Sequence, residues 1–184
     1  LLVAMAYAGL GTAVFQKRAD GRLTMAARWL LAPYLGAAWI NSRLWTRRAP
    51  QPVPVMDGVW LGRIPSEALP APLVGVVDAC AELSCRAQGA AYASVPMLDL
   101  VVPAPEQLRE AAEAIERLHA HGPLLVCCAL GYSRSAASVA TWLLRSGRAA
   151  DADAAVAIVR AARPGIVLGT AHLRAITDAA GVRA

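Results

Sequence analysis

Short apolar runs occur at intervals through the chain from residue 58 onward. Those bounded by turn-forming residues lie at residues 59–61, 74–77, 91–95 and 124–127. Runs of this length are typical of β-strands, and a continuously apolar one predicts a strand buried on both faces. The run at 124–127 is of that kind and is therefore expected at the centre of a sheet.

Helical patterns separate and follow these predicted strands. Residues 105–119 repeat apolar side chains at helical spacing, begin with Pro105 and carry Glu106 near the positive end of the helix dipole. Further helices are predicted at residues 135–144, from Asp151 or Asp153 to 159, and from Thr170 to about 180. Because strands alternate with helices, we expect an α/β fold with a central, mostly parallel sheet flanked by helices.

The pattern before residue 49 is different and far more apolar. Residues 1–15 are almost continuously apolar and are followed by Lys17 and Arg18. A helix that spans a membrane needs roughly 20 residues. Since the sequence starts with Leu, we interpret this run as the C-terminal part of a longer transmembrane helix that begins upstream. No basic region precedes the run, which argues against a signal peptide.

A second apolar run covers residues 23–40. It contains Arg28 and Pro33 and is followed by Arg43 and Arg48, which fits a short span or a helix lying in the membrane interface. The alternative is an apolar helical hairpin that packs on the rest of the protein. If the second helix lies in one leaflet, the basic residues after both runs place the main domain in the cytoplasm; if it spans, they do not decide.

Residues 49–57 are rich in proline and predict an extended linker. We therefore divide the chain into hydrophobic, membrane-associated helices at 1–48, a linker at 49–57 and an α/β domain at 58–184.

Composition narrows the possible partners. A net charge of +5 suits nucleic acid, an anionic membrane surface or phosphorylated substrates. No Lys/Arg run interleaved with aromatic residues and no zinc-knuckle motif is present, which argues against nucleic acid. The four cysteines have neither the spacing of a zinc site nor that of a disulfide framework, so we expect reduced thiols and no metal.

The segment most informative about chemistry is residues 124–135, which read LLVCCALGYSRS. A strand, a tight loop and a helix start in that order aim backbone N–H groups and the helix dipole at one point, which suits a phosphate. Arg134 can bind two phosphate oxygens, and the same field lowers the pKa of the Cys128 thiol. Ser135 can donate to the thiolate. The amides expected to hold the phosphate belong to Ala129, Leu130, Gly131, Tyr132, Ser133 and Arg134.

This Cys-x5-Arg-Ser pattern resembles the signature loop of the protein tyrosine phosphatase superfamily. The form Cys-x-x-Gly-x-Ser-Arg-Ser is most similar to the dual-specificity branch, here as a membrane-associated, bacterial-type member. The resemblance covers roughly residues 59–180 and implies a phosphocysteine at Cys128 with Arg134 as phosphoryl clamp. The family has His before the nucleophile, whereas Cys127 stands there in this chain. We interpret Cys127 as a buried strand residue, and without the His we expect a higher Cys128 pKa than is typical of the family.

Hydrolysis also requires an acid that protonates the leaving oxygen. Asp99 directly follows the strand predicted at 91–95 and lies 29 residues before Cys128, an arrangement similar to that of the family. Asp78, on an earlier predicted strand, is a weaker candidate.

The sequence thus predicts a phosphomonoester hydrolase without a cofactor. Its expected substrates are phosphoproteins carrying phosphorylated Tyr, Ser or Thr. Ala129 and Leu130 add no cations to the loop, which disfavours polyphosphorylated inositol head groups. The alternatives are a phosphatase of membrane phospholipids, such as phosphatidylglycerophosphate, and a phosphate-binding pseudophosphatase that serves as a scaffold.

Overall fold

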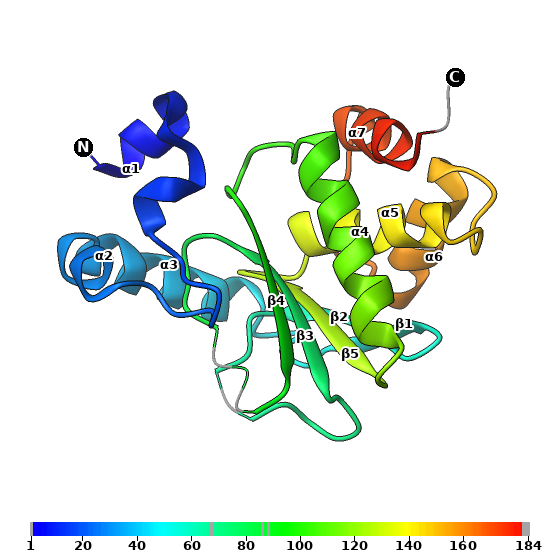
Figure 1. Ribbon diagram of the computed structural model, residues 1–184, viewed down its shortest axis with the longest axis horizontal. Helices are drawn as coiled ribbons and strands as arrows, with labels where there is room; N and C mark the ends of the chain where they lie inside the picture. Colours follow the sequence, from blue (N-terminus) through cyan, green and yellow to red (C-terminus); the bar gives the residue numbers. More distant parts are fainter. Residues whose placement is uncertain (1, 67, 86, 88, 182–184) are drawn as a thin grey trace.

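The computed structural model describes residues 2–66, 68–85, 87 and 89–181. In these residues the sheet has the strand order β1-β2-β5-β3-β4 (Figure 1). β1 runs antiparallel to β2, and all other neighbours are parallel. The strands are β1 (Val53–Met56), β2 (Val59–Arg63), β3 (Gly75–Cys80), β4 (Ala91–Met97) and β5 (Leu124–Cys128). The predicted α/β class with a mostly parallel sheet is therefore confirmed, and β5 lies at its centre.

Four helices pack on one face of the sheet and on one another. They are α4 (Pro105–His119), α5 (Arg134–Arg145), α6 (Ala152–Ala162) and α7 (Thr170–Ala180). Figure 1 shows them grouped on one side of the strands. The side chain of Asp151 accepts a hydrogen bond from the amide of Ala154 at 2.7 Å and so caps α6. Gly169, and not the predicted Thr170, occupies the cap position of α7.

The alternation of side chains along β5 divides the core into two parts. Val126 and Cys128 belong to the large cluster beneath α4 to α7, whereas Leu125 and Cys127 belong to a smaller cluster on the opposite face. Successive side chains of a strand point to opposite faces, so the two adjacent cysteines lie in different environments. Part of α3 (Ala32–Trp45) packs against the smaller cluster through Ala38.

The predicted linker at 49–57 contains a strand, which corrects the sequence-based interpretation. Val53 pairs with Leu61, and Pro54 pairs with Trp60. Proline lacks an amide donor but is tolerated on an edge strand, where one side of the backbone faces no neighbour. Proline content therefore marked the edge of the sheet instead of a free linker.

The first apolar run does not form the continuous helix that hydropathy suggests. It consists of α1 (Leu2–Met5), a π-helical turn (Ala6–Leu10) and a 3₁₀ turn (Gly11–Phe15). Gly9 breaks the helix with a φ of 137°. The second run forms α2 (Met25–Leu30) and α3. None of the helices within the described residues is long and apolar enough to cross a membrane, so the prediction of a transmembrane helix is not supported.

Part of this N-terminal segment (residues 2–48) packs on the domain, as the hairpin alternative proposed. Phe15, Leu23 and Leu31 are buried together with Ala81, which follows β3. Lys17 forms a buried ion pair with Asp78 at 2.5 Å. Elsewhere the segment exposes large apolar side chains, which include those of Met25, Trp29, Leu30, Trp39, Ile40, Leu44 and Trp45.

Candidate active site

The loop between β5 and α5, residues 128–134, forms the centre of the site. Cys128 ends the strand and Arg134 begins the helix. Gly131 has a φ of 77°, and a Cβ at this position would overlap the backbone of Gly62. Only glycine meets both conditions, so this residue allows the loop to curl tightly beside β2. The sequence-based order of strand, loop and helix is what the structure contains.

The thiol of Cys128 is buried and surrounded by hydrogen-bond donors. Its Sγ accepts a hydrogen bond from the amide of Gly131 at 3.2 Å and one from the hydroxyl of Ser135 at 3.2 Å. Burial raises the pKa of this thiol, but the Arg134 guanidinium and the donated hydrogen bonds outweigh that effect and leave the pKa below its ordinary value. The loop therefore favours a thiolate even though Cys127 replaces the expected histidine.

Arg134 is almost fully buried, and its charge is compensated by two carboxylates. Nη1 forms an ion pair with Glu82 at 2.6 Å and donates to the carbonyl of Met97 at 2.8 Å. Nη2 lies 3.0 Å from Asp99 Oδ1. Burial lowers the pKa of Arg134, but nearby Cys80, Glu82 and Cys128 hold it well above its ordinary value. The guanidinium therefore stays charged.

One edge of this guanidinium still has donors to offer. The Nε of Arg134 is buried and makes no hydrogen bond to any atom of the described residues. Nε and Nη2 form the side edge of the planar group, which matches two oxygens of a phosphate. A buried donor without a partner costs free energy, so its presence indicates a ligand that accepts from it.

Asp99 lies at the mouth of the site, directly after β4. Its side chain remains 30% exposed, and its amide donates to Glu82 Oε1 at 2.8 Å. The next residue, Leu100, has a φ of 58° and is almost fully exposed, so the chain turns sharply away after Asp99. The structure thus brings the predicted acid and the predicted clamp Arg134 together.

Glu82 is a site residue that the sequence-based reasoning missed. Its buried carboxylate binds Arg134 through Oε2 and the Asp99 amide through Oε1. Burial raises the pKa of Glu82, but Arg134 outweighs this and keeps the pKa below its usual range. Glu82 follows β3 as Asp99 follows β4, and the carboxyl ends of parallel strands share one edge of a sheet. The position of Glu82 just after a predicted strand was therefore the sequence signal that could have identified it.

Asp78, the weaker candidate for the acid, pairs with Cys127 across β3 and β5, but its carboxylate binds partners outside the signature loop. It is fully buried and accepts hydrogen bonds from Lys17 at 2.5 Å, from the hydroxyl of Tyr92 at 2.7 Å and from the amide of Cys80 at 2.8 Å. With these partners it ties the N-terminal segment to β3. A structural role accounts for all of its contacts.

Cys127 is buried on the opposite face of the sheet from Cys128. A hydrogen bond with Cys85 and burial both raise its pKa well above the ordinary value. A thiol with a raised pKa is mainly protonated and unreactive at neutral pH. The placement agrees with the interpretation of Cys127 as a strand residue in the core.

The outer side of the loop is held by residues from the C-terminal third. The ring of His172 accepts from the Gly169 amide through Nδ1 at 3.3 Å, which leaves Nε2 to donate to Ser133 Oγ at 3.2 Å. Arg163 stacks on Tyr132 at 4.8 Å and donates to the carbonyl of Leu130 at 3.4 Å. These contacts position the loop, and sequence reasoning did not identify the partner of His172.

Comparison with known proteins agrees with the fold and the loop. Residues 74–180, more than half of the chain, match the model of the dual specificity phosphatase catalytic domain. The chain therefore belongs to this family of phosphatases. No curated protein sequence matches it significantly.

Solved structures of the same fold cover most of this chain. Human DUSP28 has a TM-score of 0.61 at 24% identity, covering 72% of this chain and 94% of its own. Tk-PTP in its active form has a TM-score of 0.63 at 24% identity, covering 73% and 99%. PTPMT1 in complex with PI(5)P has a TM-score of 0.60 at 19% identity, covering 69% and 92%. At these identities the likeness concerns the fold.

Proposed function

We propose that this protein hydrolyses phosphomonoesters through a phosphocysteine at Cys128. The observation that carries the proposal is the convergence of three features on one point. A thiol with a lowered pKa lies in a tight loop at the start of α5, beside a buried guanidinium edge that includes an unpartnered Nε. Phosphate is the anion that such a cradle of amides with a bidentate arginine suits best.

In the first step the Cys128 thiolate attacks phosphorus, so that an S–P bond forms and the P–O ester bond breaks. The leaving oxygen takes a proton from Asp99. The Nε and Nη2 groups of Arg134 bind two phosphoryl oxygens, and the loop amides bind the charge that develops. Binding of phosphate to Nη2 displaces the Asp99 carboxylate from its ion pair, so that the carboxyl group can take up the proton that it passes to the leaving oxygen.

In the second step Asp99 accepts a proton from water, and the water oxygen attacks phosphorus. The S–P bond breaks, and inorganic phosphate and the Cys128 thiolate are released. The hydroxyl of Ser135, 3.2 Å from Sγ, donates to the sulfur as negative charge returns to it. Neither step requires a metal ion, since Arg134 and the amides supply the positive field.

Phosphoproteins are the substrate class that the sequence predicts, with phosphorylated Tyr, Ser or Thr as the reacting groups. A lipid phosphomonoester such as phosphatidylglycerophosphate is the second candidate. Exposed Trp29, Trp39 and Trp45 on α2 and α3 favour it, because tryptophan is enriched at membrane interfaces. PTPMT1 has been solved with PI(5)P, which agrees with this candidate. Membrane association of residues 1–48 with the catalytic domain in the cytoplasm forms part of the same proposal.

The test is turnover of an aryl phosphate by the wild type, Cys128→Ser and Asp99→Ala. We expect activity that resists chelation, is inhibited by vanadate and disappears in Cys128→Ser. Wild-type activity no higher than that of Cys128→Ser would end the enzyme interpretation and leave a phosphate-binding pseudophosphatase. Release of phosphate from phosphopeptides and from anionic phospholipids in micelles then decides between the two substrate classes.

A further inference from the structure

Helix α3 forms one wall of the cavity that leads to the signature loop. This cavity has a volume of about 440 Å³, within the range of small-molecule sites. Tyr34, Ala37 and Asn41 of α3 line one side of it, and Asp99 and Leu130 line the other. α3 lies outside the residues that match the phosphatase family, which begin at 74.

Hydrogen bonds fix α3 to the loop and to the end of β2. The hydroxyl of Ser42 donates to the carbonyl of Ala129 at 2.5 Å, and Arg43 donates to the carbonyl of Ile64 at 3.2 Å. One turn further on, Thr46 accepts from Arg63 at 2.7 Å. Ser42 and Thr46 are fully buried. The wall is therefore held in register with the atoms that would bind phosphate.

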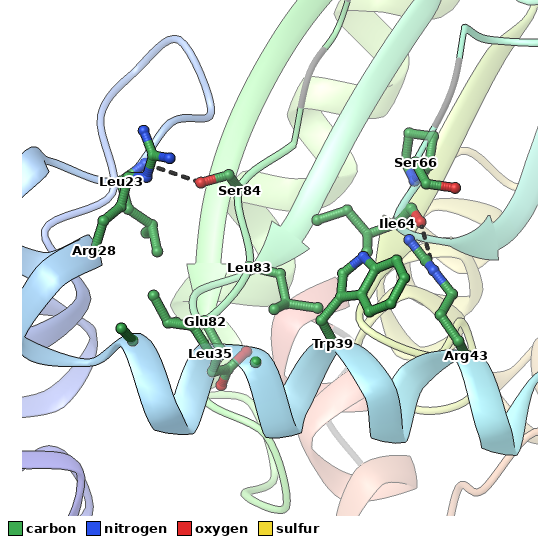
Figure 2. Close-up of a pocket in the computed structure, with 13 residues that line it drawn as sticks. Leu23, Arg28, Leu35, Trp39, Arg43, Ile64, Ser66, Glu82, Leu83 and Ser84 are labelled. Atoms are coloured by element: carbon green, nitrogen blue, oxygen red, sulfur yellow. Dashed lines mark hydrogen bonds between the residues drawn. The ribbon is translucent and has the colours of Figure 1, made fainter.

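The neighbouring face of α3 borders a second hollow of about 510 Å³, which Figure 2 shows. Leu35, Trp39 and Arg43 project from the helix toward Ile64 and Leu83 in that view. Glu82 and Leu83 line both hollows, and different residues of α3 border each of them. Of these two hollows, only the first is lined by Asp99 and by the loop residues Ala129 and Leu130, which places the Tyr34 face of α3 beside the reacting end of a substrate.

The chemistry of the first cavity restricts what carries the phosphate. Among the described residues, those that line it are alanine and leucine side chains, the phenol of Tyr34, the amide of Asn41 and the carboxylates of Glu82 and Asp99, with no Lys, Arg or His. Burial and the carboxylate of Glu82 raise the pKa of Tyr34, and its hydrogen bond with Tyr7 raises it further, so its hydroxyl stays neutral. A neutral aryl or alkyl group fits such a wall, whereas a second phosphate would find no cation.

We propose that α3 is a specificity wall of the active site, on which Tyr34 and Asn41 position the neutral group that bears the phosphate. The proposal rests on the phosphomonoesterase function above and deepens it. The substrate class is a monoester of a neutral aryl or alkyl alcohol, and the determinant lies in the N-terminal segment.

The sharpest test fills the cavity from α3. Ala37 is exposed and lines the cavity, so Ala37→Trp adds bulk there without disturbing the core. Leu44→Trp is the matched control, because Leu44 is exposed on the same helix and lines neither hollow. We expect Ala37→Trp to lower kcat/KM for a bulky fluorescein-type aryl phosphate by about tenfold or more, and Leu44→Trp to leave it within twofold.

Inhibition by vanadate separates the wall from the loop. The oxyanion contacts only the loop and Arg134, so its inhibition constant should stay within twofold in Ala37→Trp. Tyr34→Phe and Asn41→Ala each remove one hydrogen-bonding group and should raise KM about three- to tenfold with little change in kcat. An equal loss of vanadate affinity in these variants would mean that α3 only supports the loop, and would overturn the proposal.

A binding experiment tests the role of α3 separately from the proposed chemistry. On a Cys128→Ser background, the fluorescein-type phosphate should bind, and Ala37→Trp should weaken that binding about tenfold. An inositol bisphosphate should compete poorly. If the wild type shows no turnover and this binding pattern still holds, the catalytic proposal fails and the proposed role of α3 is supported. Binding that is indifferent to Ala37→Trp, or a strong preference for the bisphosphate, would overturn the wall.

Discussion

The carboxyl edge of the sheet and the N-terminal segment distribute polar and apolar side chains in opposite ways. At the edge of β5, β3 and β4, Glu82 and Arg134 are charged and buried. In the segment, Trp29 and Trp45 are apolar and 76% and 70% exposed. Both patterns depart from the usual arrangement, in which charges are solvated and large apolar groups are inside.

The difference shows where folding stability and function conflict. Burying Arg134 and Glu82 has a desolvation cost that their mutual attraction offsets only with good geometry, so such groups are retained where they do chemistry. Exposed tryptophans do not stabilise an isolated fold, and large exposed apolar patches are typical of contact surfaces. The two regions meet at the Lys17–Asp78 ion pair and at the Ser42–Ala129 hydrogen bond.

The largest effect on activity is expected from Arg134→Lys, at the carboxyl edge of the sheet. Lysine keeps the charge but cannot bind two phosphate oxygens side by side or hold Glu82 and Met97 together. We expect kcat/KM for an aryl phosphate to fall by about 10²–10³. Arg145→Lys, at the exposed end of the same helix, is the control and should stay within twofold. An Arg134→Lys enzyme within tenfold of wild type would contradict the assignment of the clamp.

The next largest effect concerns the junction between the two regions. Lys17→Met removes the cation that Asp78 faces and leaves a buried carboxylate without its ion pair. Urea denaturation should show a loss of about 3–5 kcal/mol in the free energy of unfolding. The double variant Lys17→Met with Asp78→Asn should recover a large part of it. A single variant as stable as wild type would show that the segment is not held at this point.

The Lys17–Asp78 ion pair also predicts that the free energy of unfolding depends on pH. Burial lowers the pKa of Lys17, but Asp78 outweighs this and the pKa is raised in the folded protein. Its contribution to stability is therefore full below the ordinary lysine pKa of about 10.4 and is lost as pH rises through the raised value. The difference in unfolding free energy between wild type and Lys17→Met should narrow only in strongly alkaline buffer.

Sequence patterns predicted most of the carboxyl edge of the sheet well, because the residues that form the loop lie close together in the sequence. A continuous apolar run gives β5, and Cys128, Gly131 and Arg134 are spaced within one loop and one helical turn. The role of Glu82 could not be predicted in this way. It depends on β3 lying beside β5, which brings a residue 52 positions away to Arg134. The partner of Asp78 is equally remote, 61 positions earlier in the chain.

The N-terminal segment was predicted less well for a physical reason. Hydropathy counts apolar side chains but not the backbone, so residues 1–15 indicated one helix, while Gly9 adopts a positive φ that ends it. Hydropathy also does not distinguish Phe15, which is buried, from Trp29, which is exposed. Packing against Ala81 decides between them, and only the tertiary structure contains that information.

A smaller effect tests how the residues around Cys128 lower the pKa of its thiol. Ser135→Ala removes one of the hydrogen bonds that lower the Cys128 pKa, so that pKa should rise. The midpoint of alkylation by iodoacetamide should move to higher pH, and kcat should fall about tenfold. Ser138→Ala is the control, because its hydroxyl donates to the carbonyl of Arg134 instead. An unchanged alkylation profile in Ser135→Ala would contradict the role of this hydroxyl.

The smallest effect on stability should come from the exposed tryptophans, and it gives the comparison its clearest contrast. Trp142 packs in the core and is 1% exposed. Changing it to alanine should lower the free energy of unfolding by about 3–5 kcal/mol. Trp29→Ala should change it by less than about 0.5 kcal/mol and leave turnover of a soluble aryl phosphate unaltered. Cosedimentation with vesicles of phosphatidylglycerol and phosphatidylcholine should instead weaken about tenfold, the equivalent of one large apolar side chain leaving an interface. Should wild type and Trp29→Ala sediment alike, the exposed Trp29 of α2 would not be a membrane contact.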